Sequence, residues 1–326
     1  MSKNSILSAV DLRKTFTVSS GHHSNGILTA LDRVSLHLSP GETLGIAGES
    51  GCGKSTLAKI MAGLLAPDSG TVSYKGTPLS QLEQNESVLF RRKTQMIFQD
   101  PFSSLNPRMR IGDSISEPLK IAGMARAARH EELGRLMAAV GLSGDAANRF
   151  PDEFSGGQRQ RIGIARALAA SPEILIADEP VSSLDISIQA QIINILLEMK
   201  RDFALSMMIV SHNLLVLRHI CDRIIIMYLG AIVECGPAAE IFKRCRHPYT
   251  EALIAAIPGL HVSGVSKTEL LHDDLPSALS IPPGCRFHPR CRHAVDRCRH
   301  EVPVLTEYAD GHTAACHLSS QLYGSA

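Results

Sequence analysis

The sequence lacks tryptophan, is poor in aromatic residues (4%) and carries almost no net charge. Lys and Arg together number 33 and Asp and Glu 32, which gives a formal charge of +1 over 326 residues. A dedicated nucleic-acid binder would show a strong basic excess, so this balance argues against nucleic acid as a partner. No apolar run approaches the roughly 20 residues that cross a bilayer. The start, Met1-Ser-Lys-Asn, has no apolar signal core, so we expect no secretion.

The composition is that of an ordinary globular protein, with 44% hydrophobic and 20% charged residues. It therefore excludes intrinsic disorder as the main state. The length predicts one large domain with an appendage, or two domains. Eight cysteines are present. In the reducing cytosol that we expect, they favour a metal site or free thiols over a disulfide framework.

Strand and helix patterns alternate along most of the chain. Apolar runs over 43–47, 174–177 and 207–210 predict buried strands, and helical spacing follows each of the first two. This alternation predicts an α/β fold with a parallel central sheet, and the strand-rich residues 8–45 predict a smaller antiparallel layer. A polar, Pro-rich stretch begins near residue 261. It places a domain boundary there, between 1–260 and 261–326.

A phosphate-binding loop is the strongest motif. Gly48-x4-Gly53-Lys54-Ser55 lies between a predicted strand and a predicted helix, as a P-loop requires. Glycines let successive N–H groups face inward, where they and the helix N-terminus hold nucleotide phosphates. Lys54 should reach the β- and γ-phosphates and Ser55 should bind Mg²⁺. The predicted nucleotide contacts are Gly48, Glu49, Ser50, Gly51, Cys52, Gly53, Lys54, Ser55 and Thr56. Cys52 is interpreted as filler rather than as a nucleophile.

Two carboxylates complete a hydrolytic site. Asp178 and Glu179 follow the apolar run 174–177, where a P-loop ATPase carries its second half. Asp178 would hold Mg²⁺ through water, and Glu179 would orient and polarise the attacking water. Phosphoryl transfer needs mostly positioning and charge stabilisation, so these few groups suffice. The sequence therefore predicts an ATPase that uses ATP and Mg²⁺.

Between these motifs stands Phe154-Ser155-Gly156-Gly157-Gln158. Here the sequence resembles the ATP-binding-cassette (ABC) ATPases, whose signature is this Ser-Gly-Gly-Gln element. The resemblance implies that the signature of one cassette (Ser155, Gly156, Gly157 and Gln158) closes over ATP held by a partner's P-loop. It also implies a helical subdomain over about 100–168. Locally, a serine and two glycine amides at a helix start form an anion-binding end.

The same resemblance assigns further residues one by one. Gln99 matches the glutamine that senses Mg²⁺ and water and is a third predicted metal contact beside Ser55 and Asp178. His212 matches the switch histidine that contacts the γ-phosphate. Phe16 falls where the family stacks an aromatic ring on adenine, although it could equally belong to the core. The predicted catalytic residues are Glu179, His212, Gln99 and Lys54.

Two stretches are similar to the oligopeptide and dipeptide (peptide/nickel) importer ATPases, and most of all to the F-type. They are Phe98-Gln-Asp-Pro-Phe-Ser-Ser-Leu-Asn-Pro107 and His247-Pro-Tyr-Thr-Glu-Ala-Leu253. The resemblance implies a peripheral subunit on the cytoplasmic side of a bacterial inner membrane. It implies as partners a second ATPase subunit (a D-type paralogue or a second copy), two membrane permease subunits and a periplasmic substrate-binding protein. A groove near 99–125 would receive a short cytoplasmic helix of the permease.

The tail carries four cysteines, Cys285-x5-Cys291-x6-Cys298-x17-Cys316. Thiolates suit iron–sulfur clusters or zinc, but the C-x2-C pairs of structural zinc are missing. The spacing is similar to the C-terminal motif of the peptide-importer ATPases, and that resemblance implies a [4Fe–4S] cluster. Zinc and free thiols remain open, as do His288, His293 and His317 as alternative ligands.

The leading hypothesis is thus an ATP-hydrolysing subunit of an ABC importer that takes up di- and oligopeptides. Nickel, glutathione or D-amino-acid dipeptides remain open as cargo. A non-transport ABC ATPase and a non-hydrolysing regulatory cassette are the alternatives. Against the first stand the single P-loop and the lack of sustained heptads, and against the second stand Glu179 and His212.

Overall fold

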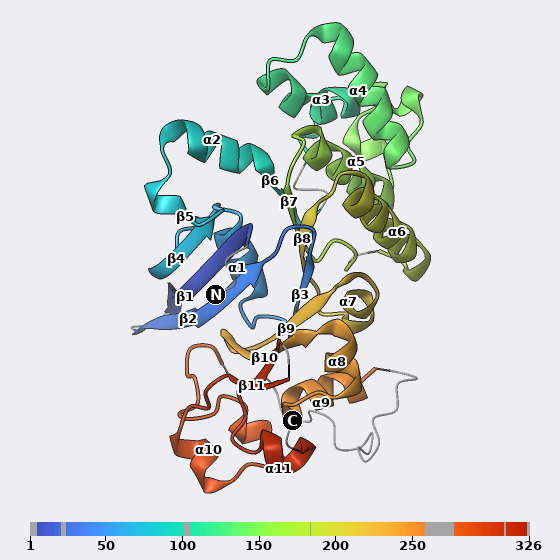
Figure 1. Ribbon diagram of the computed structural model, residues 1–326. Helices are drawn as coiled ribbons and strands as arrows, with labels where there is room; N and C mark the ends of the chain where they lie inside the picture. Colours follow the sequence, from blue (N-terminus) through green and yellow to red (C-terminus); the bar gives the residue numbers. More distant parts are fainter. Residues whose placement is uncertain are drawn as a thin grey trace.

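Two sheets and a group of helices make up the protein, seen in a computed structural model (Figure 1). The structure describes residues 5–20, 24–100, 105–182, 184–257, 277–309 and 311–324. The predicted boundary at 260 lies outside these ranges.

The main sheet contains eight described strands, and five of them run parallel. Order across the sheet is β11 (Thr306–Ala309), β12 (His312–Ala314), β10 (Ala231–Pro237), β9 (Arg223–Tyr228), β3 (Thr43–Ala47), β8 (Ser206–Val210), β7 (Ile174–Asp178) and β6 (Thr94–Ile97). The strands from β9 to β6 are parallel to one another, and β10, β12 and β11 add antiparallel pairs at one edge. The predicted α/β fold with a parallel central sheet is confirmed.

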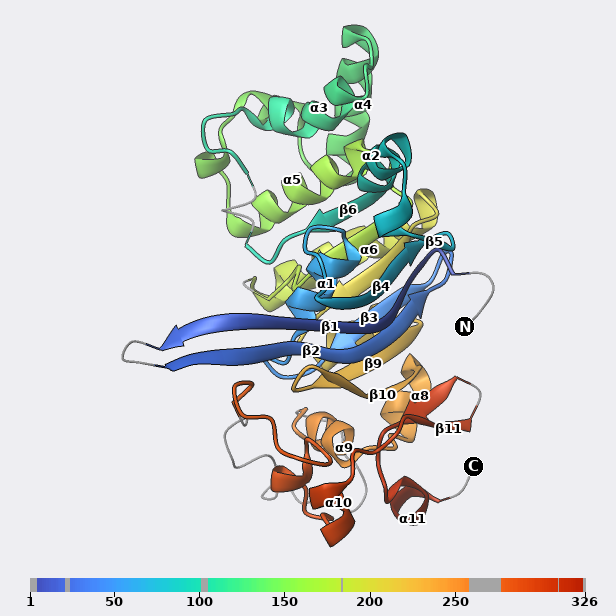
Figure 2. The ribbon, with the colours of Figure 1, turned by 90° about the vertical axis from the view of Figure 1, so that its left-hand side faces the viewer.

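A second sheet is antiparallel, as the strand-rich start predicted. Its order is β2 (Ser24–Leu38), β1 (Leu7–Ser20), β4 (Ser69–Tyr74) and β5 (Thr77–Pro78). The two long strands β1 and β2 form a hairpin that projects from the body of the molecule (Figure 2). Strand β2 begins at Ser24, although Ser24, Asn25 and Gly26 are residue types that favour turns. Cross-strand pairs such as Val18 with Gly26 keep this segment extended.

Helices flank the sheet and also form a group of their own. They are α1 (Lys54–Met61), α2 (Gln84–Lys93), α3 (Ile111–Ile121), α4 (Arg126–Ala139), α5 (Gly156–Ala169), α6 (Ile186–Asp202), α7 (Leu214–Ile220), α8 (Ala238–Lys243), α9 (Pro248–Ala255), α10 (Asp296–His300) and α11 (Ser319–Tyr323). Helices α3, α4 and α5 pack on one another at the end of the molecule far from α10 and α11 (Figure 1). In the part of the chain just given, no helix is long and apolar enough to span a membrane.

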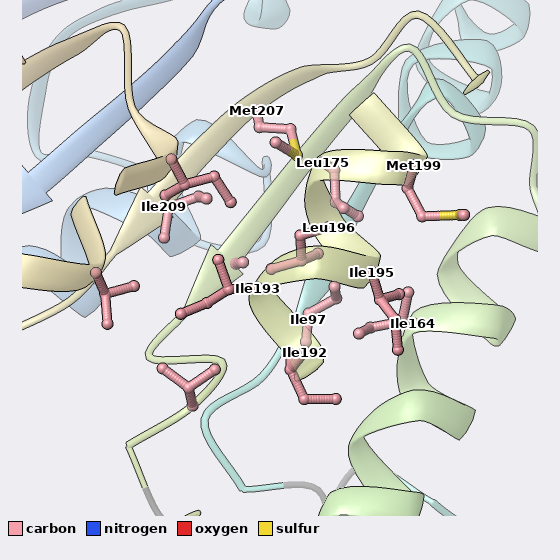
Figure 3. Close-up of a cluster of buried hydrophobic side chains, with 14 of the residues drawn as sticks. Ile97, Ile164, Leu175, Ile192, Ile193, Ile195, Leu196, Met199, Met207 and Ile209 are labelled. Carbon is pink, nitrogen blue, oxygen red and sulfur yellow. The ribbon is translucent and has the colours of Figure 1, made fainter. Parts of the chain in front are cut away.

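The two faces of the main sheet are buried in separate hydrophobic clusters. Successive residues of a strand point to opposite faces. Leu175 therefore joins the cluster with α5 and α6, whereas Ile176 joins the cluster with α1 and the antiparallel sheet. Figure 3 shows the first cluster, in which Ile192 and Leu196 of α6 lie against the sheet. Burial on both faces explains why the parallel strands are continuous apolar runs in the sequence.

The C-terminal segment 277–324, hereafter the extension, is joined to the main sheet. Strand β12 pairs with β10, and Nε2 of His312 lies 2.8 Å from a carboxylate oxygen of the fully buried Glu234. The ring of Phe287 is buried among Tyr228, Tyr249 and His247. The extension thus shares the core of the ATPase body, and its four cysteines are not its sole source of packing.

Candidate active site

The P-loop follows the carboxyl end of the buried strand β3 and leads into α1. Three of its glycines have positive φ, and at two of these there is no room for a side chain. A Cβ on Gly48 would lie 2.3 Å from the carbonyl oxygen of Met227, and one on Gly53 would lie 2.2 Å from that of Ala30. Gly53 also begins α1 without a side-chain cap. The first N–H groups of the helix therefore remain free to bind an anion.

Lys54 lies folded over this loop. Its side chain is buried, and Nζ donates to the carbonyl oxygens of Gly48 and Glu49, each at 2.8 Å. Carbonyl groups are weak partners for an ammonium compared with phosphate oxygens. A nucleotide phosphate would therefore be a stronger partner for Lys54 than these carbonyls.

Cys52 is buried within the loop, and its Sγ lies 3.9 Å from Nζ of Lys54. Burial raises the pKa of the Cys52 thiol above its usual value. A neutral, buried thiol is a poor nucleophile, which supports its interpretation as filler.

Ser55 and Asp178 meet where α1 faces the end of β7. The Ser55 hydroxyl donates to Oδ1 of Asp178 at 3.0 Å. Burial raises the pKa of Asp178, and the Ser55 bond opposes that rise. A hydroxyl and a carboxylate are hard oxygen ligands, and Mg²⁺ completes its shell with water and substrate phosphates. The pair therefore fits Mg²⁺, although no group of three or more His, Cys, Asp or Glu in the described segments could by itself hold a metal ion.

Glu179 and His212 form a second pair beside the first. Oε2 of Glu179 lies 2.5 Å from Nδ1 of His212, and the Glu179 side chain is only 11% exposed against 55% for His212. Glu179 has a left-handed backbone with φ of 49°, and its N–H donates to the carbonyl of Val210. That turn holds the carboxylate at the mouth of the site, where it can orient a water molecule.

Parallel strands bring these residues to one edge of the sheet. Asp178 pairs with Val210 in the β7–β8 register, and Ile97 of β6 pairs with Ala177. Gln99 therefore follows β6 at the same edge where Asp178 and Glu179 end β7. It is exposed there. Three residues with predicted catalytic roles, Gln99, Glu179 and His212, thus lie at the carboxyl ends of neighbouring strands.

The signature segment caps helix α5, away from the P-loop. Ser155 and Gln158 form a capping box: Gln158 N–H donates to Ser155 Oγ at 3.4 Å, and Ser155 N–H donates to Gln158 Oε1 at 3.0 Å. Gly157 is packed so closely on α6 that a Cβ would lie 2.5 Å from Ile188. Ser155 itself is exposed. The helix start is thus held on one side by its packing against α6 and exposed to solvent at Ser155, and an anion-binding helix end needs such exposure.

Phe16 lies on β1 in the projecting hairpin, opposite Leu28. Its ring is 38% exposed, and Nζ of Lys14 lies 5.6 Å from the ring centre. A half-exposed ring is available for stacking on a base. The core interpretation of Phe16 does not fit this exposure.

Sequence reasoning missed a contact between the P-loop and the extension. Arg290 of the extension binds the Glu49 carboxylate, and the Tyr249 hydroxyl accepts a hydrogen bond from Glu49 N–H at 2.9 Å. Tyr249 belongs to the segment 247–253 that marked the resemblance, but nothing in the pattern indicated that it touches nucleotide-binding residues. These contacts join residues some 200 and 241 positions apart.

The four extension cysteines do not form a metal site in the structure. Burial raises the pKa of Cys285 to about 11 and of Cys291 to about 12, and the other thiols add to both shifts. The thiols thus lie within electrostatic range of one another. No three of them, alone or with His, Asp or Glu, are arranged to hold a metal in the ranges that the structure covers. This arrangement does not support the predicted [4Fe–4S] cluster, because ligation requires thiolates that converge on one point.

Hydrolysis of a nucleoside triphosphate is the chemistry that this sheet edge can perform. It offers a glycine loop and lysine for phosphates, oxygen ligands for Mg²⁺ and a carboxylate for water. The fold and the site therefore define a P-loop ATPase.

Comparisons with known proteins narrow the class to one family. A family described as "ABC transporter" matches residues 31–182, and one described as "Oligopeptide/dipeptide transporter, C-terminal region" matches residues 233–298. The chain belongs to the ABC transporter family of ATPases, in the branch that carries this C-terminal region. The resemblance stated from the signature and the two flanking stretches is thereby confirmed.

Relatives match over nearly their whole length. The di/tripeptide transport ATP-binding protein DppF of Pseudomonas aeruginosa is 42% identical over 98% of this chain and 99% of its own. The oligopeptide transport ATP-binding protein AppF of Bacillus subtilis is 46% identical over 98% of both chains. Among solved structures, the dimeric post-hydrolysis ATP-binding cassette MJ0796 bound to ADP and Pi matches with a TM-score of 0.63. It is 29% identical and covers 71% of this chain and 98% of that chain.

Proposed function

We propose that this chain is the ATP-hydrolysing subunit of an ABC import complex that takes up di- and oligopeptides across a bacterial inner membrane. The proposal rests on two features found together. The Ser55–Asp178 and Glu179–His212 pairs lie beside the P-loop, and the family described as "Oligopeptide/dipeptide transporter, C-terminal region" matches residues 233–298. Relatives named for di/tripeptide and oligopeptide transport match the extension as well as the ATPase body. The chain would bind the cytoplasmic side of the membrane complex through protein contacts.

Each residue of the site has a defined task in hydrolysis. Lys54 and the α1 amides would neutralise the phosphate charge, and Ser55 with Asp178 would hold Mg²⁺, which supplies further charge neutralisation when bound. Glu179 orients the attacking water. His212, whose Nδ1 faces Glu179 at 2.5 Å, keeps that carboxylate aimed toward the position of the γ-phosphate. Gln99 lies at the same edge and would report the state of the site to the helices that follow it.

The signature supports a dimeric working state. Ser155 forms a capping box with Gln158 at the N-terminus of α5, and Ser155 is exposed to solvent. They are therefore suited to cover ATP held by another cassette. The partner would be a D-type paralogue or a second copy of this chain. The solved relatives MJ0796 are described as dimeric.

A groove between α2, β6 and the α3–α5 helices is suited to the permease. It has a volume of about 690 Å³, and its lining includes apolar side chains such as Ile121 and Phe98 beside Arg91 and Arg92. Ile121 is 81% exposed and lines the groove, so its apolar side chain is available to a partner there. The groove overlaps the region near residues 99–125 that was expected to receive a short permease helix. It also adjoins β6, and Gln99 follows that strand.

Charge in the groove provides the test of that docking. Ile121→Asp should prevent co-purification with the permease subunits while the isolated chain keeps its ATPase activity. Val304→Asp is the matched control, because Val304 is 79% exposed and lies in the extension, outside the groove. Normal assembly of the Ile121 variant would show that the groove is not the docking site.

Cargo is tested in the assembled transporter. Vesicles that contain the complex and its substrate-binding protein should accumulate a labelled dipeptide only when ATP is present. Excess unlabelled tripeptide should compete and Ni²⁺ should not. ATP-driven uptake of Ni²⁺ with no uptake of peptide would replace peptide by nickel as the cargo.

A [4Fe–4S] cluster at Cys285, Cys291, Cys298 and Cys316 stays a prediction. It rests on the spacing of the four cysteines in the sequence, and the lack of a converging ligand set among the described residues speaks against it. Anaerobic purification of the full chain with iron and zinc analysis decides it. About four iron atoms per chain with broad absorbance near ~400 nm would establish a cluster. A colourless protein free of iron and zinc would leave four free thiols.

A further inference from the structure

We propose that Arg290, in the extension, is a positioning residue for ATP binding, and that it acts by holding the P-loop through Glu49. The inference rests on the ATPase activity and not on the identity of the cargo. It gives the extension a direct task at the nucleotide site.

The contact between the two residues is a two-point ion pair. Nη1 of Arg290 donates to Oε2 of Glu49 at 2.7 Å, and Nη2 donates to Oε1 at 3.0 Å. The Arg290 side chain is 5% exposed and that of Glu49 is 25% exposed. A bidentate pair fixes direction as well as distance, and burial limits screening by salt. The Glu49 side chain therefore has a defined place.

Arg290 is itself held rigidly. It ends the short 3-10 turn His288–Arg290, directly after the buried ring of Phe287. That ring packs on Tyr228 and Tyr249, with centroids 5.3 and 5.4 Å away. Nη1 of Arg290 also lies 3.4 Å from the Tyr228 hydroxyl. The extension thus presents the guanidinium from a fixed base rather than from a loose surface loop.

The cost of this arrangement suggests that the pair does more than join two segments. Nε of Arg290 is buried and has no hydrogen-bond partner in the described part of the chain. A buried charge with an unsatisfied N–H is an expensive way to stabilise a fold, and an apolar pair of similar volume often serves better. What the ion pair adds is orientation of Glu49.

Glu49 transmits that orientation to the phosphate-binding groups. Its N–H donates to the Tyr249 hydroxyl at 2.9 Å, and its carbonyl oxygen accepts from Nζ of Lys54 at 2.8 Å. Side chain, N–H and carbonyl of one residue are therefore all fixed, the first two by Arg290 and Tyr249. Lys54 must release this carbonyl to bind phosphate. The position of Glu49 therefore determines the position of the Lys54 ammonium before the nucleotide binds.

The test measures ATP affinity and turnover of the purified full chain. Arg290→Met should raise the KM for ATP about tenfold, the effect of losing one charge-assisted contact, with kcat changed much less. Arg290→Lys keeps the charge without the two-point geometry and should give a smaller rise. Glu49→Gln should raise KM comparably, and the double variant with Arg290→Met should be no worse than the poorer single variant.

Arg297→Met is the matched control. Arg297 also lies in the extension, on α10, and pairs with Glu301 at 2.7 Å. Both side chains of that pair are more than half exposed, and the pair does not involve Glu49. It should leave the KM for ATP unchanged.

A purely structural role for Arg290 would give a different pattern. All variants would then lower the melting temperature, while the folded fraction would bind ATP with wild-type KM. That result, or additive effects of Glu49→Gln and Arg290→Met, would overturn the proposal. If Arg290→Met fails to fold, Arg290→Lys and Glu49→Gln still decide it, because Arg290→Lys keeps both charges and the amide oxygen of Glu49→Gln can still accept a hydrogen bond from the guanidinium.

Discussion

Replacement of Glu179 by Gln separates nucleotide binding from hydrolysis. The substitution keeps the shape of the side chain and removes the charge that would polarise water. Glu179 belongs neither to the phosphate loop nor to the Ser55–Asp178 pair, so the affinity for ATP should stay unchanged. Its hydrogen bond to His212 can be kept by the Gln amide group, so the fold should hold.

The expected loss of turnover follows from the task of Glu179. A positioned general base contributes typically ~10²–10⁴ in rate. At about 1.36 kcal/mol for each factor of ten, this corresponds to roughly 2.7–5.4 kcal/mol of activation free energy. Phosphate release by the purified protein measures kcat, and fluorescence of a nucleotide analogue measures binding. With hydrolysis blocked, the ATP-bound form should also accumulate as a closed dimer in gel filtration.

Glu198→Gln is the control for this measurement. Glu198 is exposed on α6, and the same charge is removed there without contact to the site. Its variant should match the wild type in kcat. Unchanged kcat in the Glu179 variant would refute the assignment of Glu179 to the attacking water.

Two further predictions follow from the structure. Gly53→Ala should abolish ATP binding, measured by nucleotide fluorescence, because a Cβ would lie 2.2 Å from the Ala30 carbonyl at a φ of +104°; Gly134→Ala on α4, where a Cβ would meet no atom within 4 Å, should bind normally. Burial lowers the pKa of His247 from 6.5 to about 3, so below pH 6.5 the unfolded chain binds a proton that the folded chain refuses. Stability should therefore be full above pH 6.5 and fall by up to about 1.4 kcal/mol per pH unit below it, seen as a falling melting temperature. His247→Asn should flatten that dependence, His300→Asn on the surface should not, and an equally steep dependence in the His247 variant would contradict it.

The sequence predicted which residues the fold brings together at the carboxyl ends of the parallel strands, because the motifs are local. Residues 48–55 contain the whole phosphate loop, and the carboxylates Asp178 and Glu179 follow directly on a buried strand. Parallel strands bring their carboxyl ends to one edge, so finding the strands was enough to bring Ser55 close to Asp178.

The extension was beyond prediction from the sequence, because its contacts join distant parts of the chain. Neither charge pattern nor periodicity indicates that Arg290 would meet Glu49, or that β12 would extend the main sheet at β10. The cysteine spacing drew attention to a metal, while the packing comes from Phe287 and the buried Glu234–His312 pair. The start of β2 depends on a distant contact in the same way: pairing with β1 keeps the turn-favouring residues Ser24, Asn25 and Gly26 extended.

The central claim is that the ATP site formed by one P-loop is completed by Ser155 and the N-terminus of α5 from another cassette. Ser155→Arg places a bulky charge at that end and touches no P-loop residue of its own chain. In the assembled transporter this variant should lose ATP hydrolysis and ATP-driven uptake, while the isolated subunit binds ATP with wild-type affinity. Wild-type hydrolysis and uptake by the Ser155 variant would contradict the account.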